Sequence, residues 1–251
     1  MKIKLTIKYN GAKYLGWQRQ KTRPTIQRKI EEALYKIFHQ KVIIYGASRT
    51  DAGVHAEGQV AHFTPPPSFQ PTAVGTSWNP GSPAFRPLNS CVQKINSYLP
   101  EDIRIVMAEE VQDSFHARED SVSKLYEYSI FNGKNPTKKD KTMSWWRPKK
   151  LNILLMNEAC GYLIGEHDFR LFQTSGSRTK TTFRTILEAA WRQEEDFLVF
   201  KIQGTGFLKH MIRNIVGAMY LVGSGQINPA HMIRGPTAPA CGLSLKKIFY
   251  F

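Results

Sequence analysis

The stretch VIIYGASRTDAGVHAEGQVAHF, residues 42–63, joins an apolar run to an alternating segment through a loop of small residues. From Gln59 to Phe63 polar and apolar residues alternate, which is typical of a half-buried strand. Asp51 lies between them, two residues before Gly53, and this pair of residue types is common in turns. We therefore expect Asp51 on a loop between two strands.

Upstream of this stretch the sequence predicts a strand, a basic loop and a helix. Residues 2–9 alternate polar with apolar positions, and residues 9–24 combine turn formers with four basic residues and no acid. Thr25 stands at an N-cap position. The apolar residues after it recur at helical spacing, and they are Ile26, Ile30, Ala33, Leu34, Ile37 and Phe38. We expect an amphipathic helix over 25–39 that packs on a sheet or another helix.

Downstream, residues 64–90 contain seven prolines, too many for a regular element. We expect an irregular surface insertion there. A helix over 91–99, ended by Pro100, and a strand over 103–111 follow from the apolar spacing.

The second half of the chain again has the order strand, helix, strand. The predicted elements are a strand from near Lys124, a helix over 151–163, a basic loop over 173–184, strands over 184–192 and 197–203, and a helix over 207–222. Two such runs favour an α+β fold with an antiparallel sheet and helices packed on one face. We place the boundary near residue 105, which gives lobes over 1–105 and 106–251.

Composition points to a polyanionic partner. The 251 residues are 41% hydrophobic and 12% aromatic, enough for a packed core, and the formal net charge is +15. Charge alone does not distinguish RNA from DNA or anionic lipid. Residues 134–150 hold seven basic residues, one acid and two tryptophans, Trp145 and Trp146. Such a run is either a solvated face or a nucleic-acid contact.

The cysteines, histidines and N-terminus indicate neither a metal site nor a membrane protein. The three cysteines are distant and odd in number, and the seven histidines are scattered, so we expect no disulfide framework and no metal. No phosphate-binding glycine motif occurs. The first nine residues alternate like a strand, and no apolar run is long enough to span a bilayer. We expect a soluble, cytoplasmic protein without a membrane partner.

Several blocks of the sequence point to one family. GASRTDAGVHAEGQVAHF at 46–63 resembles the signature of TruA-type tRNA pseudouridine synthases. Further blocks occur in the family order: YNGAKYLGWQRQ at 9–20, LPEDI at 99–103, FHAR at 115–118, YEY at 126–128, GEHDF at 165–169, GTGFLKHMIRNIVG at 204–217 and CGLSL at 241–245. Together they span the chain.

The resemblance implies a fold, a reaction and a partner. The fold is two ferredoxin-like lobes that share a central antiparallel sheet, with the active cleft between them. The reaction is the isomerisation of uridine to pseudouridine at positions 38 to 40 of the tRNA anticodon stem-loop, carried out by a homodimer that grips the anticodon arm. Because the isomerisation is redox-neutral, no cofactor is expected.

The resemblance also assigns site residues. Asp51 matches the catalytic nucleophile, and Arg49 matches the residue that occupies the space left by the flipped uridine. Arg213 matches the cation that accompanies the aspartate. Tyr126 matches the tyrosine that stacks on the target base, and Leu243 an apolar residue that lines the uracil site. Ser48 departs from the glycine that many members carry before this arginine, and serine lacks the freedom of glycine at positive φ.

Each site residue also has a purely structural interpretation. Asp51 fits an Asx-turn, Arg213 a surface position on an amphipathic helix, and Tyr126 and Leu243 fit core packing. A non-catalytic basic RNA-binding protein or RNA chaperone is the main alternative function. A hydrolase built on Asp51 is disfavoured, because the sequence offers no second carboxylate or Ser-His set at a recognisable spacing.

Overall fold

The structure is a computed structural model that describes residues 1–67, 88–176 and 179–251. Most of the predicted insertion over 64–90 therefore lies outside the described residues. The chain divides into two compact units, residues 1–121 with 250–251 and residues 122–249. The fold is α+β, as predicted, with mostly antiparallel strand pairing and few helices.

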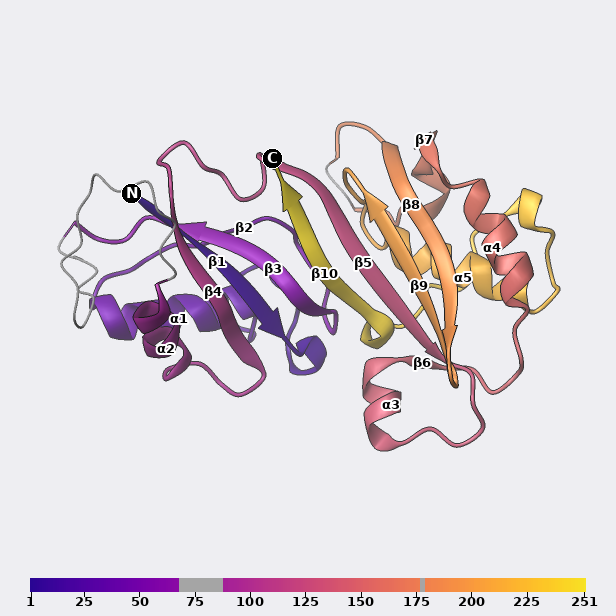
Figure 1. Cartoon of the computed structure of the whole chain (residues 1–251), viewed down its shortest axis with the longest axis horizontal. Helices are drawn as coiled ribbons and strands as arrows, with labels where there is room; N and C mark the ends of the chain where they lie inside the picture. Colours follow the sequence, from indigo (N-terminus) through magenta and orange to yellow (C-terminus); the bar gives the residue numbers. More distant parts are fainter. Residues whose placement is uncertain (68–87, 177–178) are drawn as a thin grey trace. The chain divides into compact units, whose positions relative to one another are not determined.

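The first unit is built on a small antiparallel sheet (Figure 1). Its central strand, β1 (Lys2–Tyr9), pairs with β3 (His55–Phe63) on one side and β4 (Ile103–Val111) on the other, and the short β2 (Tyr45–Gly46) pairs antiparallel with β3. Buried and half-exposed residues alternate along β1. The strands over 2–9 and 103–111 are confirmed.

The helix predicted over 25–39 is confirmed as α1 (Ile26–Phe38). The Thr25 hydroxyl accepts a hydrogen bond from the Arg28 N–H, and the helix ends at His39, whose φ of 52° is left-handed. Its buried face includes Ile30 and Leu34, which are 0% exposed. The apolar stripe therefore forms part of the core, as its spacing predicts.

Helix α2 (Asn89–Asn96) covers the outer edge of β4. The Asn96 amide donates to the Ile105 carbonyl at 2.9 Å and accepts from the Ile105 N–H at 2.8 Å. An edge strand that is paired in this way is protected from pairing with other chains. The helix ends earlier than the predicted 91–99, because after the Ser97 N–H, which bonds to the Gln93 carbonyl, the N–H groups of Tyr98 and Leu99 bond to carbonyls three residues back in a turn before Pro100.

His62 of β3 is a buried neutral imidazole. It is 3% exposed, and it stacks on Tyr45 at 5.3 Å and meets His116 edge-on at 4.9 Å between ring centroids. Its Nδ1 accepts from the Ala117 N–H at 3.1 Å. Burial, and then the charges of His116 and Lys2, lower the pKa of His62 from 6.5 to about 4. Folding therefore favours the neutral form of this side chain.

We expect His62 to make the protein less stable in mild acid. Its folded pKa lies below the unfolded one, so between pH 6.5 and 4 the unfolded chain binds more protons. The free energy of unfolding that depends on neutral His62 is therefore fully present above pH 6.5 and is lost as the pH falls toward 4. Relative to His62→Asn, urea unfolding should show the wild type losing about 2 kcal/mol between pH 7 and pH 5. Equal pH dependence in both proteins would contradict this assignment.

The second unit has its own antiparallel sheet, in the order β10-β5-β9-β8-β7. Its strands are β5 (Ser121–Phe131), β7 (Gly165–Asp168), β8 (Phe183–Glu194), β9 (Phe197–Gly204) and β10 (Leu243–Tyr250), and β6 (Trp145–Trp146) pairs parallel with β5. The predicted strands over 184–192 and 197–203 and the strand from near Lys124 are confirmed. Strands β7 and β10 lie outside the predicted elements.

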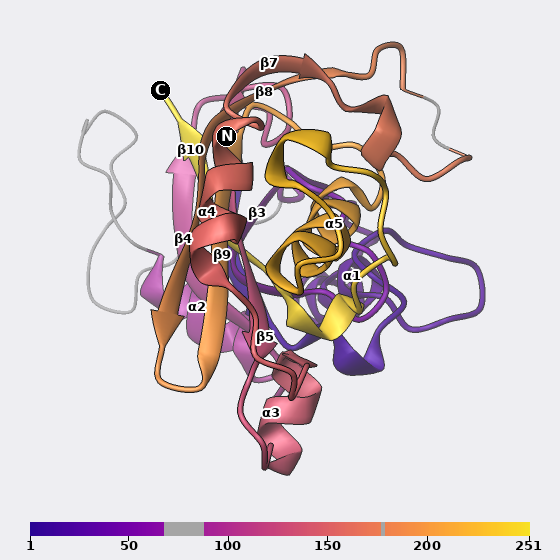
Figure 2. The ribbon, with the colours of Figure 1, turned by 90° about the vertical axis from the view of Figure 1, so that its right-hand side faces the viewer.

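Two longer helices pack together in this unit, α4 (Ile153–Gly161) and α5 (Met211–Gly223) (Figure 2). Short helical turns complete it: α3 (Lys138–Met143), η2 (Phe169–Phe172), η3 (Pro229–His231) and η4 (Ala240–Gly242); η1 (Gly11–Lys13) belongs to the first unit. The predicted helix over 207–222 is wrong at its start, because His210 has a left-handed φ of 60° and the helix begins after it. Among the described helices, none is long and apolar enough to cross a membrane.

Candidate active site

Asp51 lies on a loop between β2 and β3, as predicted, and we call residues 48–54 the Asp51 loop. The Asp51 side chain is half-buried. The Val54 N–H bonds to the Asp51 carbonyl at 3.2 Å, and Gly53 between them has a φ of 80°. A glycine suits this turn because that backbone conformation is open to it without strain.

The buried amide of Gln59 holds the start of the loop. Its Nε2 donates to the Ser48 carbonyl at 2.7 Å, and its Oε1 accepts from the Ser48 N–H at 3.2 Å. In the described part of the chain only His39, Glu195 and His210 are non-glycine residues at positive φ, so Ser48 fits without strain in place of the family glycine. Sequence reasoning missed Gln59. Its only signal in the sequence is a polar residue inside a predicted strand; the structure shows that this side chain is 0% exposed, and a buried amide needs hydrogen-bond partners.

The middle of the loop is held by residues 14–17, which we call the brace. The Trp17 N–H bonds to the Thr50 carbonyl at 3.0 Å, and the Gly53 N–H bonds to the Tyr14 carbonyl at 3.1 Å. Gly16 has a φ of 83°, and a β-carbon there would lie 2.4 Å from the Thr50 carbonyl oxygen. Only glycine permits this close approach, so the brace fixes the backbone on both sides of Asp51.

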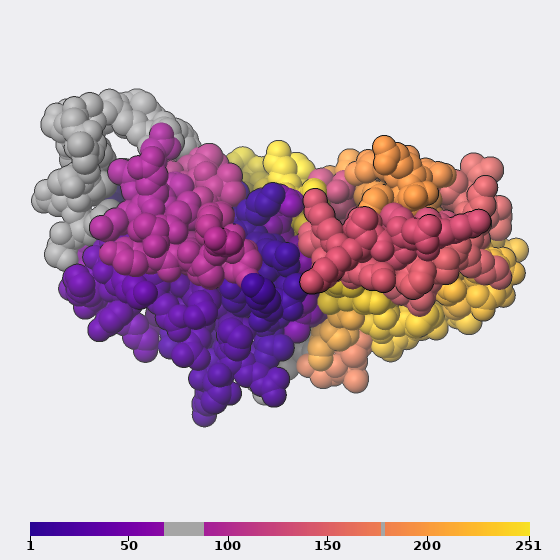
Figure 3. All heavy atoms as spheres, turned by 90° about the horizontal axis from the view of Figure 1, so that it is seen from below, coloured from indigo at the N-terminus to yellow at the C-terminus, as the bar shows by residue number. Residues whose placement is uncertain are grey.

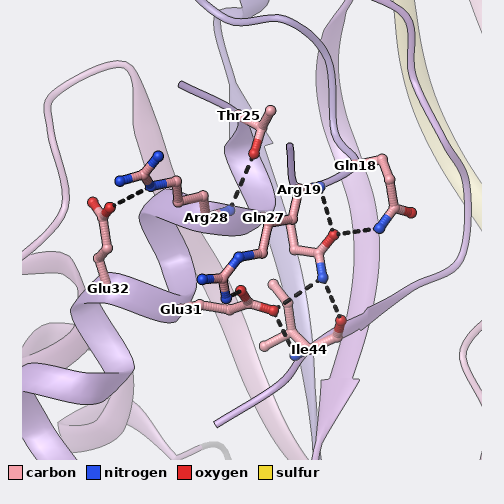
Figure 4. Close-up of polar contacts among 8 residues, drawn as sticks. All are labelled: Gln18, Arg19, Thr25, Gln27, Arg28, Glu31, Glu32 and Ile44. Carbon is pink, nitrogen blue, oxygen red and sulfur yellow. Dashed lines mark hydrogen bonds and ion pairs between the residues drawn. The ribbon is translucent and has the colours of Figure 1, made fainter. Parts of the chain in front are cut away.

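A buried polar network on α1 anchors the brace (Figure 4). Gln27 and Glu31 are 7% and 6% exposed. Gln27 Oε1 accepts from the Arg19 backbone N–H at 2.9 Å and from Gln18 Nε2 at 3.0 Å. Gln27 Nε2 donates to Glu31 Oε1 at 2.9 Å and to the Ile44 carbonyl at 3.2 Å. Glu31 also accepts from Arg19 Nη1 at 2.8 Å and from the Ile44 N–H at 3.3 Å.

We expect Glu31→Ala to weaken both the fold and the reaction. The substitution removes an acceptor shared by Arg19, Gln27 and Ile44, and buried donors left unpaired cost about 2 kcal/mol. Urea unfolding measures the loss, and kcat should fall because the brace loosens. Glu32→Ala is the matched control, since Glu32 is 43% exposed and its ion pairs are worth at most about 1 kcal/mol. Equal losses in the two variants would contradict a specific role for Glu31.

A second arginine lies near Arg49. Arg118, from the FHAR block, is exposed, and it donates from Nη2 to the Gly46 carbonyl at 3.4 Å. Burial, and then the like charge of Arg49, lower the pKa of the Arg118 guanidinium. Arg118 and Arg49 thus both bring positive charge near the start of the Asp51 loop. Sequence reasoning missed Arg118 as a site residue, although it stands in a family block.

The other three predicted residues belong to the second unit. Tyr126 of β5 is 5% exposed, and its ring meets Phe207 edge-on at 5.3 Å. Arg213 of α5 is half-buried, and its Nε donates to the Ala238 carbonyl at 2.7 Å. Leu243 begins β10 and is 6% exposed.

The guanidinium of Arg213 acts electrostatically on the segment that leads to Leu243. Burial raises the pKa of the Cys241 thiol, and the positive charge of Arg213 opposes that shift. The structure thus places Asp51 with Arg49 on one loop of the first unit, and Arg213 close to the 241–243 segment in the second.

A hollow of about 940 Å³ on the first unit is separate from the Asp51 loop. It runs along α1, and its walls include Arg28, Lys36, Lys41, Tyr35 and Tyr98. No residue of the Asp51 loop contributes to these walls. Concave shape alone therefore does not identify the reacting centre in this unit.

Comparison with known proteins gives the family. Residues 5–118 and 159–250 match the model of the tRNA pseudouridine synthase family. The chain belongs to this family of isomerases. A tRNA pseudouridine synthase A 2 from Clostridium perfringens is 38% identical over 99% of both chains. A tRNA pseudouridine synthase A from Francisella tularensis subsp. novicida is 37% identical over 90% of this chain and 81% of its own.

A chain of a solved Cbf5-Nop10-Gar1 complex is also similar to this synthase. It aligns with a TM-score of 0.41 and 12% identity, covering 97% of this chain and 48% of that chain. The two segments of the synthase that match the family model contain the Asp51 loop, Arg118, Arg213 and Leu243, whereas Tyr126 falls between them.

Proposed function

We propose that this synthase converts uridine to pseudouridine in the anticodon stem-loop of tRNA, at positions 38 to 40, with Asp51 as the nucleophile. The observation that carries the proposal is the bracing of the Asp51 loop. Gln59 and the brace hold its backbone, and Arg49 and Arg118 supply positive charge next to it. A carboxylate on a fixed loop beside cations is suited to attack on a polyanionic substrate.

The proposed reaction moves one bond and one proton. With Asp51 attacking the target nucleotide, the bond between uracil N1 and the ribose breaks. The uracil turns, its C5 bonds to the ribose carbon, the bond between Asp51 and the nucleotide breaks, and the proton lost from C5 is balanced by protonation of N1. No electrons are gained or lost, so the step needs no redox cofactor.

The remaining residues have roles that the family resemblance assigns. Arg49 fills the space left by the flipped nucleotide, and Arg213 compensates the charge of the aspartate. Tyr126 stacks on the uracil, which is a contact that an aromatic ring can make, and its ring is already held nearly perpendicular to that of Phe207. Leu243 lines the uracil site. This proposal includes two ferredoxin-like lobes, a cleft between them, and a cytoplasmic homodimer that grips the anticodon arm.

The proposal is tested by mapping pseudouridine in an unmodified tRNA transcript after incubation with the purified protein. Carbodiimide labelling marks pseudouridine, and reverse transcription then stops beside each labelled base. Stops at positions 38 to 40 that depend on the protein are the expected result. Stops elsewhere would contradict the anticodon assignment, and binding of tRNA without any stop would support a non-catalytic RNA-binding protein instead.

A further inference from the structure

The basic segment 134–150 lies between the two parts of the chain that match the family model. It comprises α3, β6 and the turns around them, all in the second unit. Figure 3 looks at the molecule from below Figure 1 and shows this segment, in rose, at the surface facing the viewer. Nothing assigned so far to the uridine site uses it.

The structure separates the two tryptophans of this segment. Trp145 is 6% exposed, and the Arg147 guanidinium lies 4.0 Å from its ring centroid and 5.0 Å from that of Tyr220. Trp146 is 40% exposed. Both tryptophans pair with β5, but Trp145 is buried against a half-buried Arg147, whereas Trp146 presents an aromatic surface to solvent.

The indole of Trp146 is held in place before any ligand arrives. Its Nε1 donates to the Gly133 carbonyl at 3.1 Å, its backbone pairs with Phe131, and Lys141 Nζ lies 5.6 Å from the ring centroid. A base that stacks on a fixed ring loses less conformational freedom on both sides than one that stacks on a mobile ring.

Six exposed lysines lie in the same segment as this ring, and they are Lys134, Lys138, Lys139, Lys141, Lys149 and Lys150. The single acid of the segment, Asp140, is engaged by Thr137 in a capping box at the start of α3. Among the residues that the structure describes, none of the six lysines forms an ion pair. The charge of the segment is therefore available to a ligand.

Two acids share a hollow with lysines of this segment. The hollow, of about 590 Å³, is lined by Lys134 and Lys150 together with Glu195 and Asp196 from the turn between β8 and β9. The two acids oppose the attraction of a polyanion to the two lysines. Lys138, Lys139 and Lys141 are not part of this lining.

We propose that Trp146 and the six lysines form a tRNA-binding platform, in which the lysines contact backbone phosphates and an unpaired base stacks on Trp146. Lysine charge without acidic partners matches a phosphate backbone, and an exposed tryptophan beside it matches a base. The platform is distinct from the proposed uracil contact, because Trp146 pairs with Phe131, five residues beyond Tyr126 on β5. That spacing corresponds to roughly 17 Å along the strand.

The proposal rests on tRNA being the substrate, and its test separates binding from catalysis. The triple variant Lys138→Gln, Lys139→Gln, Lys141→Gln and the single variant Trp146→Ala are compared with the wild type for binding to an unmodified tRNA transcript at several salt concentrations. The matched control is Lys8→Gln, Lys29→Gln, Lys201→Gln, which removes the same formal charge from lysines already paired with Glu57, Glu32 and Glu188.

We expect the platform triple variant to bind more weakly and to lower the slope of log Kd against log salt by about 2 to 3, because each lost phosphate contact removes about 0.7 to 0.9. Trp146→Ala should weaken binding about 10-fold without changing the slope, and Trp146→Phe should restore most of the affinity. The control triple variant should keep the wild-type slope.

At saturating tRNA all variants should keep the wild-type kcat, which separates this proposal from the uridine site. Wild-type affinity and slope in both platform variants would overturn the platform and leave the proposed reaction untouched. Absence of pseudouridine formation by the wild type would instead overturn the proposed function, while the binding measurements would still decide the platform.

Discussion

Asp51→Asn is expected to lower pseudouridine formation about 10⁴-fold or more, because removal of a nucleophile abolishes the chemical step and leaves only binding. Asparagine has nearly the same shape but lacks the charge and nucleophilicity of the carboxylate. The side chain is half-buried, and the hydrogen bonds between the brace and the loop reach the backbone of Thr50 and Gly53. The fold should therefore survive the substitution.

The measurement is single-turnover pseudouridine formation in a tRNA transcript, with a thermal melt and a tRNA-binding curve on the same samples. Glu57→Gln is the matched control: Glu57 lies on β3 of the same unit, is 39% exposed and pairs with Lys8. It should retain wild-type activity. An Asp51→Asn protein that folds, binds tRNA and still forms pseudouridine within 10-fold of the wild-type rate, a margin of about 1.4 kcal/mol, would remove Asp51 from the chemistry.

Gly217→Ala is expected to destabilise the protein by about 2 to 3 kcal/mol. A β-carbon at Gly217 of α5 would lie 1.8 Å from the Pro236 carbonyl oxygen, which is a backbone atom and cannot rotate away. The segment over 235–238 must therefore move. That segment carries the Ala238 carbonyl that accepts from Arg213 Nε, so activity should fall as well.

Thermal unfolding measures this effect, and for a chain of this size the expected drop in Tm is about 5 to 10 °C. Gly161→Ala is the control, because Gly161 ends helix α4 and a β-carbon there meets nothing within 4 Å. It should leave Tm unchanged or raise it slightly, since alanine favours the helix. A Gly217→Ala protein as stable as this control would show that the 235–238 segment does not press on α5.

Strands and helices whose apolar residues follow a regular spacing within a short stretch of sequence could be predicted from the sequence. The 2–9 strand, the 25–39 helix and the 103–111 strand all combine a clear period with a cap or a breaker at one end, and the structure confirms them. The side-chain period of a strand or helix depends only on consecutive residues, so it can be recognised in the sequence without knowing which elements pack against it.

Elements that depend on distant partners could not be predicted. The edge strand β7 has four residues, and β10 gains its place by pairing with β5 more than a hundred residues earlier. The start of α5 was misplaced because a left-handed His210 interrupts an apolar pattern that continues through it. Such choices are made by tertiary packing, which overrides local propensity.

The sequence by itself determined the loop position of Asp51, the basic character of the protein and, through ordered family blocks, its family. The tertiary structure alone decided what surrounds that aspartate. Only folding brings the Gln59 amide to the start of the loop, Glu31 to Arg19 just after the brace, and the charge of Arg118 near Arg49. It likewise decided which of two adjacent tryptophans faces solvent. The physical reason is that burial and pairing are properties of the assembled sheet and core, whereas periodicity and charge belong to the chain.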